Sequence, residues 1–216
     1  MQPDVLENLV TKLANLRLNS TVIEGLASDR YRRIVFSGMG STVHACYPTY
    51  RRIMEAGIEA HWVETSELLM GFDFLFQRET LVVAVSQSGE SAEIVALSKR
   101  ASEFGHIIGV TNDADSCLGK SAGTLIELHA GVESTVSCKN YVATLAALEW
   151  LGSHLLERHS LRNTEIGTEV RRSVSDLRAT QSSVREYLKQ WHQHIVDLAP
   201  IVEGVSSIFV TGEVIP

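Results

Sequence analysis

The sequence has 216 residues, of which 44% are hydrophobic and 21% are charged, so it can bury a substantial core and is neither disordered nor of low complexity. Its 19 basic and 26 acidic residues give a net charge of -7, which argues against broad electrostatic binding to nucleic acid or to an anionic membrane surface. An anionic ligand would therefore need a local binding site.

After a helical N-terminal segment, residues 1–30, apolar runs rich in β-branched residues alternate with segments of helical periodicity. Strands are predicted over residues 33–36, 58–63, 81–86, 106–111 and 124–128, and helices over residues 41–56, 90–103 and 115–122. Gly57, Gly105 and Gly123 each precede a strand, where a left-handed cap of the preceding helix is expected.

The predicted strands are almost continuously apolar, as residues 81–85 illustrate. Strands of this kind are typical of parallel sheets that helices cover on both faces. The pattern predicts the α/β class: a three-layer αβα sandwich with a five-stranded parallel sheet in the flavodoxin-like order 2-1-3-4-5, followed by long C-terminal helices.

The C-terminal third is helical in pattern from residue 138 to residue 199, and Pro200 is expected to end this stretch. Leu145, Leu148, Leu151 and Leu155 supply more apolar surface than one sheet needs for its cover. We therefore expect these helices also to pack against a partner subunit, in a homo-oligomer.

Residues 205–212, Val-Ser-Ser-Ile-Phe-Val-Thr-Gly, resemble the first predicted strand and the glycine after it. One interpretation is a sixth edge strand, and the other, which we favour, is the start of a second copy of the unit. The predicted organisation is a helical segment over residues 1–30, a ligand-binding domain over residues 31–160, a helical connector over residues 161–204 and a second unit beginning at residues 205–216. The chain would then be a fragment of a longer protein.

Two unusual loops follow the first and third predicted strands. They are Ser37-Gly-Met-Gly-Ser-Thr-Val-His44 and Ser86-Gln-Ser-Gly-Glu-Ser91. In an open parallel sheet, ligands bind beyond the carboxyl ends of the strands, where the strand order reverses, and these loops would flank that point. Each leads into a helix whose free N–H groups favour an anion, and the hydroxyls add neutral donors. Serine and threonine are also ordinary helix caps, but two such loops at this position predict a phosphate site.

Other ligand and nucleophile motifs match less well. Gly38 and Gly40, with Glu64 after the second strand, partly match the dinucleotide fingerprint, but the third glycine is missing. Ser86 stands where a nucleophile elbow around Ser88 would need glycine, and no Walker A lysine is present. A dinucleotide site and a serine hydrolase are therefore the weaker hypotheses.

Three cysteines, Cys46, Cys117 and Cys138, show no metal-binding spacing and suit a reducing compartment. No apolar run is long enough to span a membrane, and the acidic N-terminus differs from a secretory signal. We expect a cytoplasmic protein that uses no metal or cofactor.

Three segments resemble the SIS (sugar isomerase) domain family over about residues 30–150. Residues 86–91 resemble its SQSGET segment, and residues 38–45 resemble its first phosphate loop. Residues 130–139, Ala-Gly-Val-Glu-Ser-Thr-Val-Ser-Cys-Lys, are similar to its AGxExxVAxTK stretch, although they are one residue shorter. Within the family, the sequence resembles the isomerase halves of glucosamine-6-phosphate synthases and the fructosamine-6-phosphate deglycases.

The resemblance implies which residues bind the substrate. The phosphate and the neighbouring sugar hydroxyls would be bound by Gly40, Ser41, Thr42, Ser86, Gln87, Ser88 and Ser91, with Val136 and either Ser137 or Cys138 along the sugar. Glu133 matches a family glutamate and is the catalytic candidate, and a structural cap or ion pair is the alternative. In relatives with two SIS copies, the acid–base residues lie in the second copy or in a neighbouring subunit, and this sequence has no counterpart.

The resemblance thus implies an aldose–ketose isomerase or an amino-sugar or fructosamine phosphate deglycase whose partner is a small phosphosugar. The alternative is a non-catalytic phosphosugar sensor. Residues 4–30 are not basic, so the chain itself is not expected to read DNA.

Overall fold

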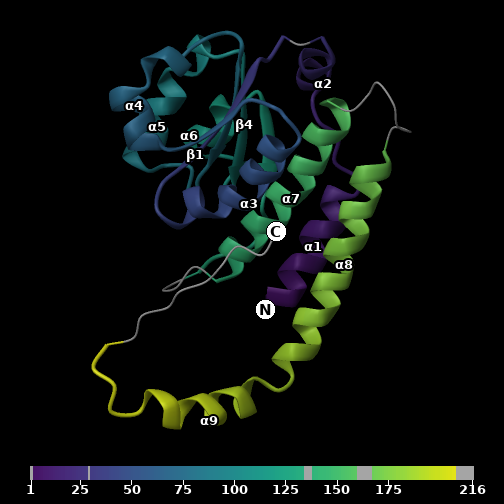
Figure 1. The fold of residues 1–216 in the computed structure, drawn as a ribbon, viewed down its shortest axis with the longest axis vertical. Coiled ribbons are helices and arrows are strands. Elements are labelled where there is room, and N and C mark those ends of the chain that lie inside the picture. Colours follow the sequence, from purple (N-terminus) through teal and green to yellow (C-terminus); the bar gives the residue numbers. More distant parts are fainter. Residues whose placement is uncertain (1, 29, 134–137, 160–166, 208–216) are drawn as a thin grey trace.

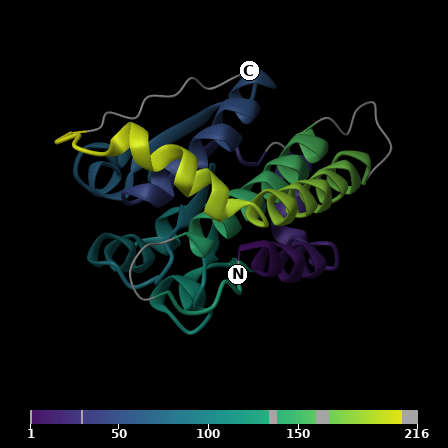
Figure 2. The same cartoon turned by 90° about the horizontal axis from the view of Figure 1, so that it is seen from below.

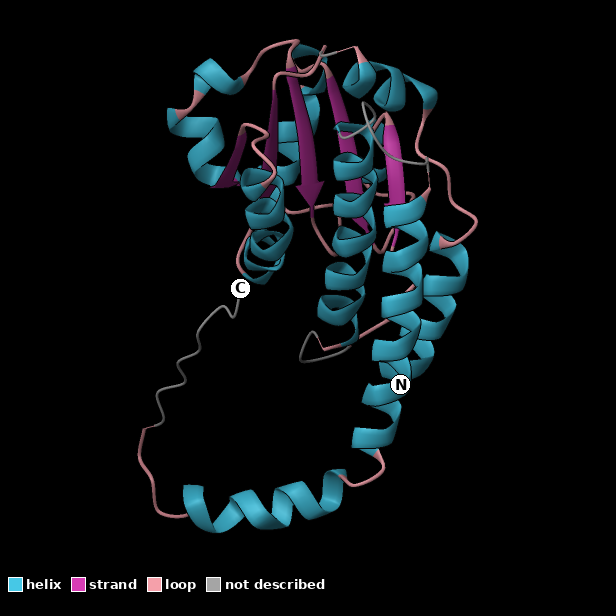
Figure 3. Ribbon diagram, turned by 45° about the vertical axis from the view of Figure 1, so that its right-hand side comes forward, coloured by secondary structure: helices cyan, strands magenta, loops and turns pink. Residues whose placement is uncertain are grey.

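The centre of the molecule is a parallel sheet of five strands in the order β2-β1-β3-β4-β5. The computed structural model describes residues 2–28, 30–133, 138–159 and 167–207. The strands are β1 (Arg33–Gly38), β2 (Ala60–Glu64), β3 (Thr80–Val85), β4 (His106–Thr111) and β5 (Thr124–Glu127). Helices lie on both faces of this sheet (Figure 3), so the predicted α/β class and strand order are confirmed.

The strand register brings the ends of β1, β2 and β3 together. Gly38, the last residue of β1, lies opposite Glu64 of β2 and Val85 of β3. Both predicted ligand loops therefore leave the sheet at the same edge, beside the point where the strand order reverses.

One face of the sheet packs on α3 (Ser41–Glu55) and α7 (Lys139–His159), with α1 (Gln2–Leu13), α2 (Ser20–Ala27) and α8 (Thr168–Leu188) outside them. Figures 1 and 2 show α1 and α8 side by side along α7. Alternate strand residues such as Phe36 and Val83 join this core, and Leu9 and Val22 extend it into α1 and α2. The N-terminal helices thus share one continuous core with the sheet.

The opposite face packs on α4 (Thr65–Gly71), α5 (Ala92–Lys99) and α6 (Cys117–Ser121), with single turns at Asp73–Leu75 and Ala101–Glu103. Val35, Val82 and Ala84 point to this side and meet Ile94 and Leu97 of α5. Every residue of β3 is buried, because its two faces are both covered.

The C-terminal helices differ from the prediction. The expected end at Pro200 was wrong, because Pro200 lies inside α9 (Trp191–Val202). Pro200 has no N–H to donate to the carbonyl four residues earlier, so α9 loses one hydrogen bond there and ends two residues later, at Val202. The helical stretch is instead interrupted at Lys189 and Gln190, between α8 and α9.

The three predicted glycine caps have different roles. Gly57 has a φ of 79° and caps the end of α3, as predicted, but Gly105 and Gly123 are not among the glycines with positive φ. A Cβ at Gly105 would lie 2.1 Å from the carbonyl oxygen of Arg78, and one at Gly123 would lie 2.5 Å from the His106 ring. These two positions need glycine for close packing, so the expectation of left-handed caps there was wrong.

The leucines of α7 are used inside the chain. Leu148, Leu151 and Leu155 are fully buried in the core, and Leu145 packs against it. Of the twelve large apolar residues that are exposed in the described part of the chain, six lie on α9, which buries none of its residues and stands apart from the sheet in Figure 1. None of the described helices is both long and apolar enough to cross a bilayer.

Candidate functional site

The loop after β1 forms the first wall of a pocket at the carboxyl edge of the sheet. Gly40, with a φ of 56°, is the N-cap residue of α3. The Thr42 hydroxyl donates to the carbonyl of Met39 at 2.8 Å and accepts from the Met39 N–H at 3.0 Å. A Cβ at Gly38 would lie 2.6 Å from that hydroxyl, so only glycine lets the loop turn this tightly.

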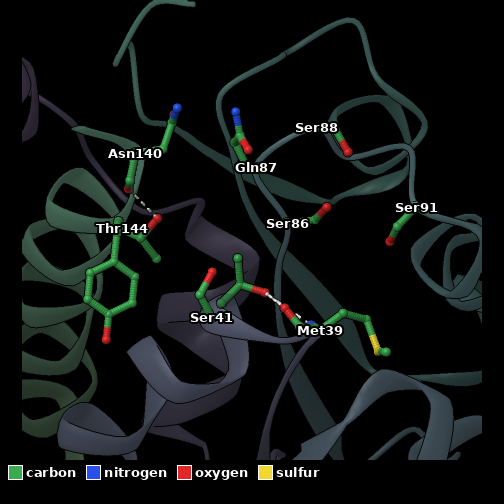
Figure 4. Close-up of a pocket in the computed structure, with 10 residues that line it drawn as sticks. Met39, Ser41, Ser86, Gln87, Ser88, Ser91, Asn140 and Thr144 are labelled. Carbon is green, nitrogen blue, oxygen red and sulfur yellow. Dashed lines mark hydrogen bonds between the residues drawn. The ribbon is translucent and has the colours of Figure 1, made fainter. Parts of the chain in front are cut away.

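The loop after β3 forms the second wall, and its own hydroxyls shape it. Ser86 Oγ accepts from the Gly89 N–H at 3.1 Å, and Ser88 Oγ accepts from the Glu90 N–H at 3.2 Å. Gly89 has a φ of 65°, which completes the turn into α5. These contacts hold the serine side chains around the start of α5 (Figure 4).

The first two turns of α7 form the third wall. The three walls enclose a cavity of about 210 Å³, smaller than the roughly 300–1,000 Å³ of drug-sized sites, and its size therefore suits a small ligand. Its lining consists of Met39, Ser41, Thr42, Ser86, Gln87, Ser88, Ser91, Asn140, Tyr141 and Thr144. No lysine, arginine, histidine or carboxylate occurs among these lining residues, so any anion there would meet neutral donors.

Two helices begin at this pocket without a side-chain cap. The N-cap residues Gly40 of α3 and Ser91 of α5 make no side-chain hydrogen bond to their helices, whereas Asn19 caps α2 and Ser116 caps α6. The buried Ser91 hydroxyl has no hydrogen-bond partner. N–H groups at an uncapped N-terminus attract an anion, and an unpartnered hydroxyl is a ready donor. The pocket can therefore hold a small anion without a cation.

Glu133 does not line the pocket and instead caps α7. Its Oε1 accepts from the N–H groups of Cys138 at 3.0 Å and Lys139 at 2.7 Å. Its Oε2 accepts from the N–H of Asn140 at 3.2 Å and from the Asn140 side-chain amide at 2.6 Å. These contacts are those of a helix cap, the predicted alternative to a catalytic role for Glu133.

Burial alone would raise the pKa of Glu133, but the hydrogen bonds from Lys139, Asn140 and Cys138 outweigh burial and lower the pKa to about 2. A carboxylate with this pKa is a weak base near neutral pH and holds no proton to donate. The geometry therefore favours a capping role for Glu133 over proton transfer.

The structure brings most of the predicted substrate-binding residues together. Six of them, Ser41, Thr42, Ser86, Gln87, Ser88 and Ser91, line the pocket, and Gly40 lies directly before α3. Cys138 is exposed and lines a different cavity, beside Gln2 and Leu188. Val136 and Ser137 lie outside the described residues.

Sequence reasoning missed four lining residues, namely Met39, Asn140, Tyr141 and Thr144. Met39 lies within the first loop, between its two glycines. Asn140 and Thr144 are four residues apart at the start of a helix, so they share one of its faces. That spacing indicates a polar helix face, but only the position of α7 in the structure shows that this face lines the pocket. Among the described residues, no group of three or more histidine, cysteine or acidic side chains could hold a metal ion.

Comparison with known proteins points in one direction. Residues 29–153 match the SIS domain family. The chain is 33% identical over 181 residues to the glutamine–fructose-6-phosphate aminotransferase [isomerizing] of Gloeobacter violaceus, which covers 81% of this chain and 29% of that protein. It is 28% identical over 215 residues to the protein of the same name from Staphylococcus epidermidis, and that alignment covers 96% of this chain and 33% of that protein.

A solved structure shares the fold. The C-terminal domain of glucosamine-fructose-6-phosphate aminotransferase from Francisella tularensis superimposes with a TM-score of 0.74 at 20% identity, over 88% of this chain and 54% of that one. The chain spans about a third of the length of the two curated relatives.

Proposed function

Since this chain belongs to the SIS domain family, we propose that it is the phosphosugar-binding unit of an enzyme that interconverts an aldose and a ketose phosphate, or that acts on an amine at C1 or C2 of a sugar phosphate. Curated relatives named as isomerizing aminotransferases of fructose 6-phosphate support this reaction class. The pocket at the carboxyl edge of the sheet is the proposed phosphate site.

The observation that carries the proposal is the Ser91 hydroxyl. It is buried and unpartnered in the pocket wall, at the N-terminus of a helix that has no side-chain cap. Figure 4 shows Ser91 near Ser86 and Ser88, with Met39 of the first wall below them. A bound phosphate would give this hydroxyl an acceptor, and a hydrogen bond to a charged group contributes about 1.5–3 kcal/mol.

The proton-transfer step would use groups from elsewhere. Isomerisation needs an acid or base beside C1 and C2, and the described residues that line the pocket include no carboxylate or imidazole. The strand-like repeat at residues 205–212 supports a second unit as the source, although residues 208–216 lie outside the described part of the chain. A neighbouring subunit is the other source.

A phosphosugar sensor is the second candidate. The neutral lining favours it, because a sensor needs the phosphate-binding groups but no acid or base. Turnover of a sugar phosphate by the native protein would decide for the enzyme. Binding with no turnover of any sugar phosphate by the native protein would decide for the sensor.

The binding test compares two serines of the same helix segment. The full chain should be stabilised by fructose 6-phosphate or glucosamine 6-phosphate, by about 5–10 °C at a hundredfold excess over Kd, and not by NAD. Ser91→Ala should weaken this binding about tenfold, because it removes one bond to a charged group. It should leave the melting temperature of the free protein nearly unchanged, since the hydroxyl has no partner to lose.

Ser98→Ala is the matched control. Ser98 lies seven positions further along the chain, within α5, and its hydroxyl is also buried and unpartnered, but it does not line the pocket. Its variant should bind like the wild type. Equal affinities of the Ser91 and Ser98 variants, or stabilisation by NAD alone, would overturn the proposed site.

A further inference from the structure

Asn112 directly follows β4 and joins two walls of the pocket without lining it. Its backbone N–H donates to the carbonyl of Gln87 at 3.0 Å, and the hydroxyl of Thr111 donates to the same carbonyl at 3.1 Å. Gln87 belongs to the loop that carries Ser86 and Ser91. The backbone of Asn112 therefore sets the position of the second wall.

The side chain of Asn112 holds the segment that leads to the third wall. Its Oδ1 accepts from the N–H of Ala130 at 2.7 Å, and its Nδ2 donates to the carbonyl of Gly131 at 2.9 Å. The orientation of the amide is determined, because a flipped amide would place its NH₂ against an N–H and its oxygen against a carbonyl. His129, with a φ of 50°, and Gly131, with a φ of 71°, turn the chain sharply at this point.

Glu133 continues the connection from this turn to α7. It lies two residues after Gly131, and its carboxylate accepts from the backbone N–H groups of Cys138, Lys139 and Asn140 at the start of α7 and from the Asn140 side-chain amide. The Lys139 ammonium donates to the carbonyl of Val132 at 3.1 Å and ties the same turn back to the segment. Asn140, which is 1% exposed, is part of the pocket wall.

These contacts form one continuous path from the loop of residues 86–91, the serine loop, to α7 on the other side of the pocket. We infer that Asn112 and Glu133 are positioning residues that set the distance between the phosphate-binding loop and the first turns of α7, and thereby the length of phosphate ester that the pocket accepts. The inference rests on the proposed function. Neither side chain lines the pocket, so both act through the residues that do.

The path predicts a selective loss of binding. Inorganic phosphate would use only the two loops that lead into α3 and α5, whereas a sugar phosphate would also contact Asn140, Tyr141 and Thr144 on α7. Asn112→Ala should therefore weaken fructose 6-phosphate about tenfold or more while changing the affinity for inorganic phosphate less than about twofold. Titration calorimetry and ligand-observed NMR on the full chain measure the two dissociation constants.

Glu133→Gln is the second variant. It replaces one acceptor oxygen with an NH₂ that would face N–H donors, so the first turn of α7 loses part of its cap. It also removes a negative charge, which by itself would favour an anion. A weaker affinity for the sugar phosphate with this variant would therefore reflect geometry and not charge.

Asn15→Ala is the matched control. Asn15 follows α1, and its amide donates to the carbonyl of Thr11 at 2.9 Å on the surface, away from the pocket lining. This variant should bind both ligands as the wild type does. Proportional losses of both ligands in the Asn112 and Glu133 variants would assign the path to folding alone, and unchanged affinities would also overturn the inference.

Hydrogen exchange separates failure of the inference from failure of the proposed function. If the wild type binds neither ligand, the proposed function is wrong, and amide exchange in the free protein still tests the path. In Asn112→Ala, exchange should rise at Ala130, whose N–H loses its acceptor, and over residues 138–140, while the rest of α7 keeps its protection. Unchanged exchange over residues 138–140 would overturn the inference whatever the binding result.

Discussion

Gly89 shows how one backbone position can control the proposed phosphate site. Its φ of 65° lies in the left-handed region, and a Cβ there would approach Ser116 Oγ to 2.1 Å. Ser116 is the N-cap of α6, where its hydroxyl accepts from the Gly119 N–H at 3.1 Å. The glycine thus allows the serine loop to lie directly against the start of a neighbouring helix.

Gly89→Ala should therefore destabilise the protein by about 1–3 kcal/mol, because it adds a steric clash to the strain of the left-handed backbone. It should also weaken phosphosugar binding about tenfold or more, since the serine hydroxyls move. Urea unfolding and titration with fructose 6-phosphate measure the two effects.

Gly57→Ala measures the cost of a left-handed backbone without a steric clash. Gly57 has a φ of 79°, but a Cβ there would meet nothing within 4 Å, and the residue is far from the pocket lining. This variant should lose only about 1 kcal/mol of stability and no affinity. Equal losses of stability in the two variants would show that the contact with Ser116 does not matter.

At the scale of elements, the helices that surround the pocket start in different ways. The carboxylate of Glu133 already satisfies the first N–H groups of α7, whereas α3 and α5 have no side-chain cap. An anion is therefore best held at α3 and α5. The arrangement also makes the N-terminus of α7 sensitive to acid.

The pH dependence follows from the lowered pKa of Glu133. The folded pKa of Glu133, about 2, lies below the ordinary glutamate pKa of 4.5, which stands for the unfolded chain. The cap therefore contributes its full stability above the unfolded pKa and loses it as the pH falls through 4.5 toward 2. The melting temperature of the wild type should exceed that of Glu133→Gln at neutral pH, and the difference should shrink in this acidic range.

A constant difference between the two melting temperatures over that range would contradict the cap. Because the other carboxylates titrate equally in both proteins, the comparison isolates Glu133. A difference that grew as the pH fell would mean that the folded pKa is raised, which is the opposite of the effect of hydrogen bonds to the carboxylate.

The helices α7 and α9 divide the apolar surface of the C-terminal third. The leucines that suggested a partner subunit lie in the core on α7, whereas α9 exposes Ile195, Leu198 and Ile201. The homo-oligomer therefore stays a prediction. The exposed apolar residues that could support it lie on α9 and not on α7. The predicted domain boundaries, the second unit among them, and the cytoplasmic location also stay predictions.

At the scale of the whole molecule, a net charge of -7 surrounds a pocket whose described lining carries no cation. Binding by neutral donors depends little on salt, whereas a site made of lysines or arginines weakens as salt screens it. The affinity for fructose 6-phosphate should therefore change less than about threefold between about 0.02 and 0.3 M salt. Any change should be toward tighter binding at the higher salt concentration, because salt screens the repulsion between the negatively charged protein and the phosphate. Titrations at constant pH check this.

A tenfold loss of affinity over that range would show that a cation contributes to the site. Such a cation would have to come from outside the described pocket lining, for example from a second unit. The salt dependence thus also reports whether the isolated chain holds the whole phosphate site.

The strands and the two loops after β1 and β3 could be predicted from the sequence, because each depends on a local pattern of apolar residues, glycines and hydroxyls. The strand order was predicted from the flavodoxin-like topology expected for such a pattern. Six predicted residues from these loops line one pocket, since parallel strands place their carboxyl ends at one edge. Only the tertiary structure brought Asn140 and Thr144 into that pocket, gave Glu133 to α7 as a cap and joined Asn112 to Ala130. These contacts depend on where α7 packs across the sheet, and that position follows from the whole core and from no local pattern in the chain.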